Sequence, residues 1–375
     1  MPSPLPHGAR RALVQRLAES RRRRGDCAVV KGHHNINYVV PLGIRLSLLL
    51  GVAPWARGKI RVPLDTVEVV PRIWPREADV LRVVSRHIRG LPRCLAEFGE
   101  WSLHAYQKGR ALAELNPAGA VDDDLMREFA EFFARTASVP TDELPPRPEG
   151  WPEDGDSDGF LHWLVDFTEE RVHRAHRDRF GSLFDDLLIP DHAMATFKKA
   201  HGGLTPRPFR LLHTDVHRSN VVVHRGRVTV IDWELAMYGD PLHELATHLV
   251  RMRYDRRAQA RMTDLWAEAM VRAGHEPLTA GLQDLAVYLA FEHAQSVFPD
   301  VMRAALALPE EPDTAHFRSA AATICEALRT ARDPLQLIEV PDETRAVKAL
   351  REWHAGDAGS GGNTAGSSVR RHDHD

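Results

Sequence analysis

Residues 213–220 read HTDVHRSN and residues 227–232 read RVTVID, so two carboxylates and one carboxamide lie in a short stretch. The sequence predicts a strand over FRLL (209–212) just before the first motif. It also predicts that NVVVH (220–224) pairs with RVTVID across Arg225 and Gly226, as a β-hairpin. A strand, a tight loop and a hairpin would bring Asp215, Asn220 and Asp232 to one edge of a sheet.

These three side chains suit a magnesium site. Mg²⁺ prefers oxygen ligands and usually takes only one or two protein carboxylates, leaving other positions to water and phosphate oxygens. We expect Asn220 and Asp232 to hold the metal. Asp215 is then free to accept the proton of a hydroxyl group, or to orient it, for attack on a γ-phosphate. These residues and the neighbouring His213 also have purely structural interpretations. His213 could be a buried core histidine, and Asp232 could be a helix cap.

The spacing H-x-D-x-x-x-x-N is the skeleton of the kinase catalytic loop. HTDVHRSN followed by VTVIDWELAMYGDPLHELA (228–246) resembles the signature of the aminoglycoside phosphotransferase and choline kinase family, whose members share the protein-kinase-like fold. The resemblance implies an α+β, two-lobed fold with a small β-rich N-lobe and a larger helical C-lobe. It implies ATP-dependent phosphorylation of a hydroxyl group, with Asp215 as the catalytic carboxylate, Asn220 and Asp232 on Mg²⁺, and His213 bracing the loop.

Further positions follow from the same resemblance. Asp240 and Glu244 fall in the segment that supports the catalytic loop, although many members have Asp where this chain has Glu244. YQKGRAL at 106–112 resembles the family's hinge, where Gly109 permits the bend and main-chain groups meet the adenine.

The phosphate-binding turn departs from a Gly-rich loop. KGHHNINYVV has one glycine, Gly32, and its side-chain donors are Asn35, Asn37, His33 and His34. We expect Gly32, Asn35 and Asn37 to contact the nucleotide; a polar hairpin turn is the structural alternative.

A cation on the third strand should neutralise the α- and β-phosphates. Reading TVEVVPRIW (66–74) as that strand assigns Arg72 to the role, held by Glu77 at the start of a helix that the apolar spacing predicts up to about His87. Because the family usually has Lys there, Arg61 or Lys59 on KIRV are the alternatives.

The composition divides the chain into four parts. We predict a basic N-terminal extension (1–25), a β-rich nucleotide lobe (26–108), a helical catalytic and substrate lobe (109–355) and a disordered tail (356–375). The extension holds seven arginines, and we interpret it as an amphipathic helix with Leu13, Val14 and Leu17 facing inward. An anionic partner is the alternative interpretation.

Bulk properties narrow the class of protein. With 43% hydrophobic and 27% charged residues, the 375-residue chain has an ordinary globular composition. A formal net charge of −3 gives no global field for nucleic acid. No apolar stretch is long enough to cross a bilayer, so we expect neither a nucleic-acid nor a membrane partner. Three distant cysteines predict a reducing, cytoplasmic location.

The sequence therefore predicts an ATP- and Mg²⁺-dependent phosphotransferase that acts on a hydroxyl of a small molecule. The acceptor would be an aminoglycoside-like antibiotic, an amino-sugar or an amino alcohol, and ATP is not distinguished from GTP. One alternative is a kinase-like enzyme acting on Ser or Thr of a peptide, and another is a nucleotide-binding pseudokinase. The remote alternative is a metal-dependent hydrolase that uses His213, Asp215 and His217 as ligands.

Overall fold

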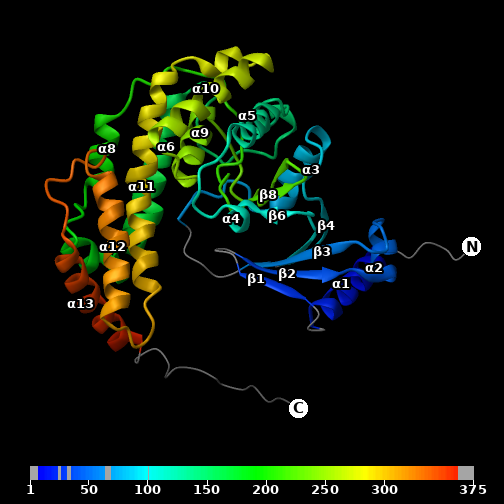
Figure 1. Ribbon diagram of the computed structural model, residues 1–375, viewed down its shortest axis with the longest axis horizontal. Coiled ribbons are helices and arrows are strands. Elements are labelled where there is room, and N and C mark those ends of the chain that lie inside the picture. Colours follow the sequence, from blue (N-terminus) through cyan, green and yellow to red (C-terminus); the bar gives the residue numbers. More distant parts are fainter. Residues whose placement is uncertain (1–6, 24–26, 32–34, 64–68, 100, 362–375) are drawn as a thin grey trace, which may run out of the picture. The chain divides into compact units, whose positions relative to one another are not determined.

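The computed structural model describes residues 7–23, 27–31, 35–63, 69–99 and 101–361 (Figure 1). The chain separates into two compact units. The first unit consists of Met1–Val67, Arg72–Gly155 and Pro206–Leu282, and the second of Glu68–Pro71, Asp156–Thr205 and Gln283–Asp375. The residues predicted for the catalytic loop and the magnesium site all lie in the first unit.

The N-terminal part of the first unit is an antiparallel five-stranded sheet in the order β1-β2-β3-β5-β4. Its strands are β1 (Ala28–Lys31), β2 (Asn35–Pro41), β3 (Arg57–Pro63), β4 (Cys94–Phe98) and β5 (Trp101–Ala105). Helices α1 (His7–Arg23) and α2 (Gly43–Leu50) share an apolar core with this sheet, which includes Ile60 of β3. Since strand side chains alternate between faces, Lys59 and Arg61 lie on the face of β3 opposite Ile60.

The basic extension forms helix α1, as predicted. Val14 and Ala18 are buried in the core of the sheet, and Leu17 packs against it. Leu13, predicted to face inward, is 38% exposed. It lies at the edge of the apolar stripe, because successive helical residues are rotated by about 100°.

The prediction of a strand over 66–74 is wrong for the described part, because residues 69–74 form no strand. Pro71 has no N–H to give to a sheet, and the segment is anchored instead by the buried indole of Trp74. That indole donates to the carbonyls of Pro145 and Pro146 at 3.2 and 3.1 Å. The strand next to β2 is β3, which carries both Lys59 and Arg61.

Helices and short strands complete the first unit. They are α3 (Glu77–His87), β6 (Arg110–Ala111), α4 (Leu112–Leu115), α5 (Asp123–Ala137), the 3-10 turn η1 (Thr141–Glu143), β7 (Arg210–Leu212), β8 (Val221–His224), β9 (Arg227–Val230), β10 (Met237–Gly239), α9 (Pro241–Arg251), α10 (Arg256–Arg272) and the 3-10 turn η4 (Glu276–Thr279). The predicted helix from Glu77 to His87 and the predicted hairpin are confirmed. Arg225 and Gly226 both have positive φ, at 52° and 76°, as a two-residue hairpin turn of type I′ requires.

Gly109 allows the chain to pass close to β8. Its φ is +138°, and a Cβ there would lie 2.6 Å from both Val222 Cγ1 and the carbonyl oxygen of Val223. Only glycine fits this contact, which lets β6 pair with β8 directly after the hinge-like segment.

The second unit is helical. Its elements are α6 (Ser157–Phe167), the π-helical turn η2 (Thr168–His173), the 3-10 turn η3 (Arg174–His176), α7 (Arg177–Asp186), α8 (Ala193–Ala200), α11 (Leu285–Leu306), α12 (Thr314–Ala331) and α13 (Glu343–Gly361); the 3-10 turn η5 (Leu282–Asp284) precedes α11. Helices α11 and α12 pack side by side, and α12 packs on α13 (Figure 1).

The predicted disordered tail begins too early. Helix α13 continues to Gly361, so residues 356–361 are helical. Asp357 pairs with Arg179 of α7 at 2.8 Å, which fastens this end of the helix. The prediction placed these residues in the tail because the segment is rich in glycine and serine, and the sequence alone does not show the ion pair of Asp357 with Arg179. Residues 362–375 lie outside the described residues.

Two further features concern membranes and cysteines. No helix in the described part of the chain has the length and apolar character to cross a bilayer. Cys27, Cys94 and Cys325 are all free thiols.

Candidate active site

The loop 213–220 is held by a buried carboxylate of α9. Glu244 is 3% exposed and accepts hydrogen bonds from the backbone N–H groups of His213 and Thr214, the latter at 3.0 Å. Burial raises the pKa of Glu244 to about 7, against the two N–H donors, which lower it. Thr214 has a φ of +59°, and its hydroxyl donates to the carbonyl of Leu235 at 2.7 Å. As the resemblance implied, Glu244 supports the catalytic loop.

Glu244→Gln should lower the free energy of unfolding by about 1–3 kcal/mol, because one of the two N–H donors would face the carboxamide NH₂ instead of an acceptor oxygen. Urea denaturation would measure the loss. Glu268→Gln, on the exposed side of α10, is the matched control and should have no such effect. Equal stability of Glu244→Gln and the control would contradict this bracing role.

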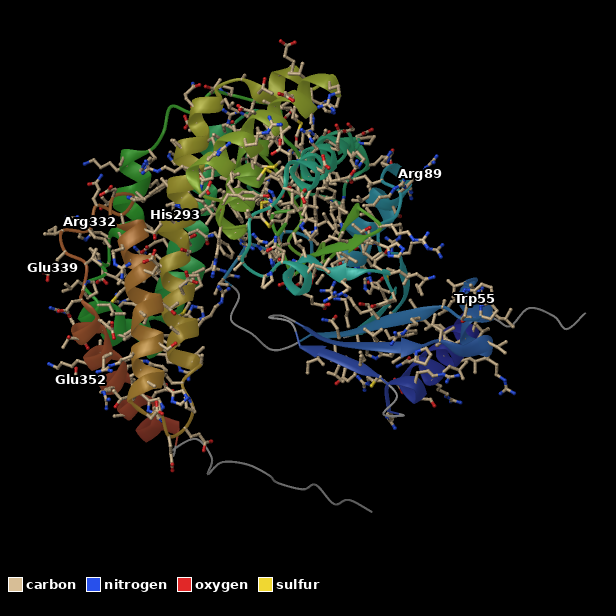
Figure 2. The ribbon with its side chains drawn as sticks, viewed as in Figure 1. Trp55, Arg89, His293, Arg332, Glu339 and Glu352 are labelled. Atoms are coloured by element: carbon tan, nitrogen blue, oxygen red, sulfur yellow. The ribbon has the colours of Figure 1, made fainter. Side chains whose placement is uncertain are left out.

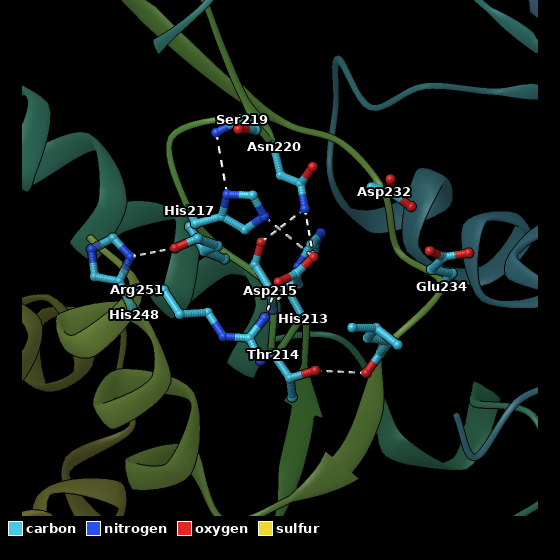
Figure 3. A network of polar contacts seen from close by, with 12 residues as sticks. His213, Thr214, Asp215, His217, Ser219, Asn220, Asp232, Glu234, His248 and Arg251 are labelled. Atoms are coloured by element: carbon cyan, nitrogen blue, oxygen red, sulfur yellow. Dashed lines mark hydrogen bonds and ion pairs between the residues drawn. The ribbon is translucent and has the colours of Figure 1, made fainter. Parts of the chain in front are cut away.

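Asp215 lies among three donors from the loop and α9 (Figure 3). Arg251 forms an ion pair with its Oδ1, the Asn220 amide donates to its Oδ2 at 2.7 Å, and His217 Nε2 lies 3.5 Å from Oδ2. Burial would raise the pKa of Asp215, but Arg251 and then His217 lower it to about 2. The carboxylate is therefore ionised at neutral pH and held in one orientation.

His213 is a packing residue of the loop. Its ring is fully buried, with its centroid 4.7 Å from that of Trp233, and its Nδ1 accepts from the backbone N–H of Asp215 at 3.3 Å. Burial lowers its pKa to about 4. This hydrogen bond links the ring to the backbone of the loop. No group of three His, Cys, Asp or Glu side chains in the described residues could hold a metal ion, so the ligand set of the hydrolase alternative does not assemble there.

Asn220 and Asp232 are joined through the backbone of the hairpin. The N–H of Ile231, next to Asp232, donates to the carbonyl of Asn220 at 2.9 Å. The Asn220 amide nitrogen is committed to Asp215, so its oxygen is left as an acceptor, and Figure 3 shows that oxygen on the side where Asp232 lies. Asp232 has a φ of +73°, a conformation that non-glycine residues rarely adopt. One carboxylate and one amide oxygen form a donor set that fits Mg²⁺.

Arg61 of β3 is the cation that meets the carboxylates. It forms ion pairs with Glu77 of α3, with Asp232 at 2.7 Å and with Glu234 at 3.3 Å. Burial alone would lower the pKa of Arg61, but Asp232 and Glu77 raise it, so the guanidinium stays charged. Glu77 also accepts from the backbone N–H of Trp233 at 2.9 Å, which connects α3 to the segment after Asp232.

The predicted pair of Arg72 with Glu77 is therefore wrong. Arg72 contacts Glu234 at 3.1 Å, while Glu77 contacts Arg61. The cause is the strand assignment, since β3 precedes the segment that carries Arg72. The third candidate, Lys59, lies on the Arg61 face of β3, and burial followed by Arg61 lowers its pKa.

The predicted nucleotide contacts in the turn are only partly described. Gly32, with His33 and His34, lies outside the described residues, and for Asn35 the backbone alone is described, at the start of β2. Asn37 pairs directly with Arg61 across the two strands, which places its side chain on the Arg61 face. Its buried Oδ1 has no hydrogen-bond partner among the described residues.

Two side chains of the site, Glu234 and Arg251, were not predicted from the sequence. Glu234 stands two residues after Asp232, and its acidic character was the available signal. Arg251 ends α9, far from Asp215 in the sequence, and no motif marked it.

Asp240 stabilises the start of α9. Its side chain caps this helix, and it forms a buried ion pair with Arg207 at 2.5 Å.

The third strand of the sheet carries Arg61, the loop 213–220 carries Asp215, and the hairpin ends at Asp232. This arrangement is that of a kinase-like phosphotransferase. The chain belongs to the phosphotransferase enzyme family (APH), whose model matches residues 63–288. The resemblance found in the sequence and the α+β protein-kinase-like fold are thereby confirmed. No curated protein sequence matches the chain.

Solved structures share the fold at low identity. A putative aminoglycoside phosphotransferase from Ralstonia eutropha is 14% identical, with a TM-score of 0.53 over 91% of this chain and 98% of that one. A choline/ethanolamine kinase family protein from Mesorhizobium loti is 15% identical, with a TM-score of 0.51 over 90% and 99%. A macrolide 2′-phosphotransferase from Brachybacterium faecium is 15% identical, with a TM-score of 0.50 over 84% and 97%.

Proposed function

We propose that this phosphotransferase moves the γ-phosphate of ATP, with Mg²⁺, to a hydroxyl group of a small molecule. The observation that carries the proposal is the convergence of Asp215, Asn220 and Asp232 with the Arg61–Glu77 ion pair in one compact unit. Phosphoryl transfer needs positioning and charge neutralisation more than covalent chemistry. This constellation has a group for each task.

Mg²⁺ would be held by the Asn220 amide oxygen and the Asp232 carboxylate. When bound, the ion neutralises charge on the phosphate oxygens. A structural relative, aminoglycoside 2′-phosphotransferase-IIIa, is known as a GDP complex at a TM-score of 0.51, which supports a nucleotide site in this fold. The buried Oδ1 of Asn37 beside Arg61 is a further group that a nucleotide could satisfy.

Asp215 would orient the acceptor hydroxyl. A carboxylate with a pKa lowered to about 2 by Arg251 is a weak base, so alignment contributes more than early proton removal. In a loose transition state the hydroxyl proton is lost late, which suits such a group.

The acceptor class rests on the family and its relatives. Structural relatives are named for aminoglycosides, macrolides and choline or ethanolamine, so a small molecule of the amino-sugar or amino-alcohol kind is proposed here. A Ser or Thr of a peptide would use the same geometry and belongs in the same screen. A cytoplasmic location agrees with the three free thiols.

The test is calorimetric titration of the full chain with ATP and with GTP, with and without Mg²⁺. Binding that depends on Mg²⁺, followed by turnover with an amino-sugar or amino-alcohol acceptor, supports the proposal. Binding without turnover on any acceptor, peptides included, would indicate a pseudokinase. Absence of binding would reject the nucleotide site.

Arg61→Ala should raise the KM for ATP about 10- to 100-fold, because a charge-assisted contact to phosphate contributes roughly 1.5–3 kcal/mol. Arg72→Ala should change the KM less than about threefold, since the Arg72 side chain is partly exposed and pairs with Glu234. Arg61→Lys keeps a cation beside Glu77 and should restore part of the affinity. Steady-state kinetics measure all three, and a larger effect at Arg72 would return the phosphate contact to that residue.

A further inference from the structure

The N-terminal segment has a charge opposite to that of the rest of the chain. Residues 1–62 hold 12 Lys or Arg and 2 Asp or Glu, a net charge of +10, whereas residues 63–375 hold 37 and 50, a net charge of −13. The match to the phosphotransferase family begins at residue 63. The positive charge therefore lies outside the matched residues and needs its own explanation.

Helix α1 displays much of this charge to solvent. Arg10, Arg11, Arg16 and Arg23 are exposed, and Glu19 is the sole acid between His7 and Arg23. Its apolar side packs on the sheet, and these four arginines remain exposed. A solvated helix face usually alternates the two signs of charge, and this one does not.

Beside α1, helix α2 and the turn after it expose large apolar side chains. Ile44 is 65% exposed, Leu48 is 69% exposed and Trp55 is 79% exposed. Ile44 and Leu48 are one helical turn apart on α2, and Figure 2 shows Trp55 at the α2 end of the sheet. No charged residue occurs between Arg45 and Arg57. We call α1, α2 and residues 51–57 the basic–apolar surface.

A depression of about 590 Å³ opens where the two helices meet β4, which contributes Glu97 to its lining. Arg10 and Arg11 of α1 line it together with Leu49 and Leu50 of α2. The Arg10 guanidinium donates to the carbonyl of Leu49, and that of Arg11 donates to the carbonyl of Glu97 at 3.2 Å. The two cations are thus held where an anion with an apolar body could enter.

We propose that the basic–apolar surface binds an anionic lipid bilayer. Arginines attract acidic headgroups, and exposed Trp and aliphatic side chains are stabilised at the boundary between headgroups and acyl chains. A soluble acidic protein would account for the arginines, but it would leave Ile44, Leu48 and Trp55 unexplained. We expected no membrane partner because no apolar stretch is long enough to cross a bilayer. Binding to the bilayer surface does not need a spanning segment.

The test is co-sedimentation of the full chain with vesicles of phosphatidylcholine alone, or with about a third phosphatidylserine. We expect binding to the anionic vesicles to be at least about tenfold tighter and to weaken as salt is raised. Equal binding to both vesicles, or binding to neither, overturns the proposal. The assay does not use phosphotransfer, so its result is independent of the proposed function.

Charge variants test the role of α1. The triple variant Arg10→Gln, Arg11→Gln, Arg16→Gln should weaken binding about 100-fold, since each cation near the surface contributes roughly fivefold. The matched control removes three exposed arginines elsewhere: Arg89→Gln, Arg318→Gln, Arg332→Gln (Arg89 and Arg332 are marked in Figure 2). An equal loss in the control would show that only total charge matters and would reject this surface.

Apolar variants separate a bilayer from a soluble polyanion. Leu48→Ser with Trp55→Ser should weaken vesicle binding at least about tenfold, while the control Ile338→Ser, at a 98% exposed position, should not. If the Leu48/Trp55 variant binds vesicles normally and soluble polyglutamate displaces the protein from them, the surface recognises an acidic polymer and the bilayer proposal fails. Circular dichroism confirms that each variant is folded.

Discussion

Asp215→Asn should lower kcat by about 10²–10⁴-fold and leave the affinity for Mg²⁺–ATP nearly unchanged. The carboxamide keeps the size of the side chain, and its oxygen can still accept from Asn220. It cannot offer the hydroxyl a full negative charge, and it no longer neutralises Arg251. Because Asp215 would not touch the metal, the loss should fall on kcat.

The measurement pairs steady-state kinetics with calorimetric titration of Mg²⁺–ATP on the same preparation. Asp264→Asn, an exposed carboxylate of α10, controls for the change in net charge and should behave like the parent protein. If Asp215→Asn instead loses Mg²⁺–ATP affinity while the turnover of bound nucleotide is unchanged, Asp215 is a metal ligand and the assignment of roles is reversed.

The catalytic loop and the hairpin were predictable because their contacts are local. His213, Asp215, Asn220 and Asp232 lie within twenty residues, and the strand pattern around them fixes which ends meet. The turn residues Arg225 and Gly226 set the hairpin register. Short-range geometry of this kind leaves few alternatives.

The position of Arg61, the proposed phosphate cation, was not predictable in the same way. Arg61 and Arg72 both stand in apolar, β-like segments, and the choice between them depends on which segment pairs with β2. That pairing is decided by distant partners, such as Ile60 in the core with Val14, and by Pro71. Arg251 was missed for a related reason, because a helix brings it to Asp215 from 36 residues away.

Arg61 also explains why the carboxylates can stand so close together. Glu77, Asp232 and Glu234 surround one guanidinium, which compensates part of their mutual repulsion. A change at Asp232 is therefore expected to have two effects, one on Arg61 and one on the proposed metal site, whereas a change at Glu234 acts on Arg61. The two effects can be separated by varying Mg²⁺.

Asp232→Asn should weaken the binding of Mg²⁺–ATP at least about tenfold, while the binding of ATP without Mg²⁺ should be unchanged or tighter. Loss of a metal ligand is expected to reduce metal affinity by at least the 10- to 100-fold seen for its supporting partners. Without the ion, Asp232 repels the phosphates, so its neutralisation removes a repulsion and frees Arg61 from one partner. Whether Asp232→Asn weakens the binding of ATP or leaves it unchanged or tighter thus depends on whether Mg²⁺ is present.

Glu234→Gln is the matched control, because Glu234 contacts the same Arg61 at 3.3 Å but is not a proposed ligand. Like Asp232→Asn, Glu234→Gln should bind metal-free ATP with unchanged or higher affinity. Its affinity for Mg²⁺–ATP should stay within a few-fold of that of the parent protein. Calorimetric titration with and without Mg²⁺ measures both variants. If Asp232→Asn and Glu234→Gln respond alike under both conditions, Asp232 acts only through Arg61, and the metal site must be sought elsewhere in the chain.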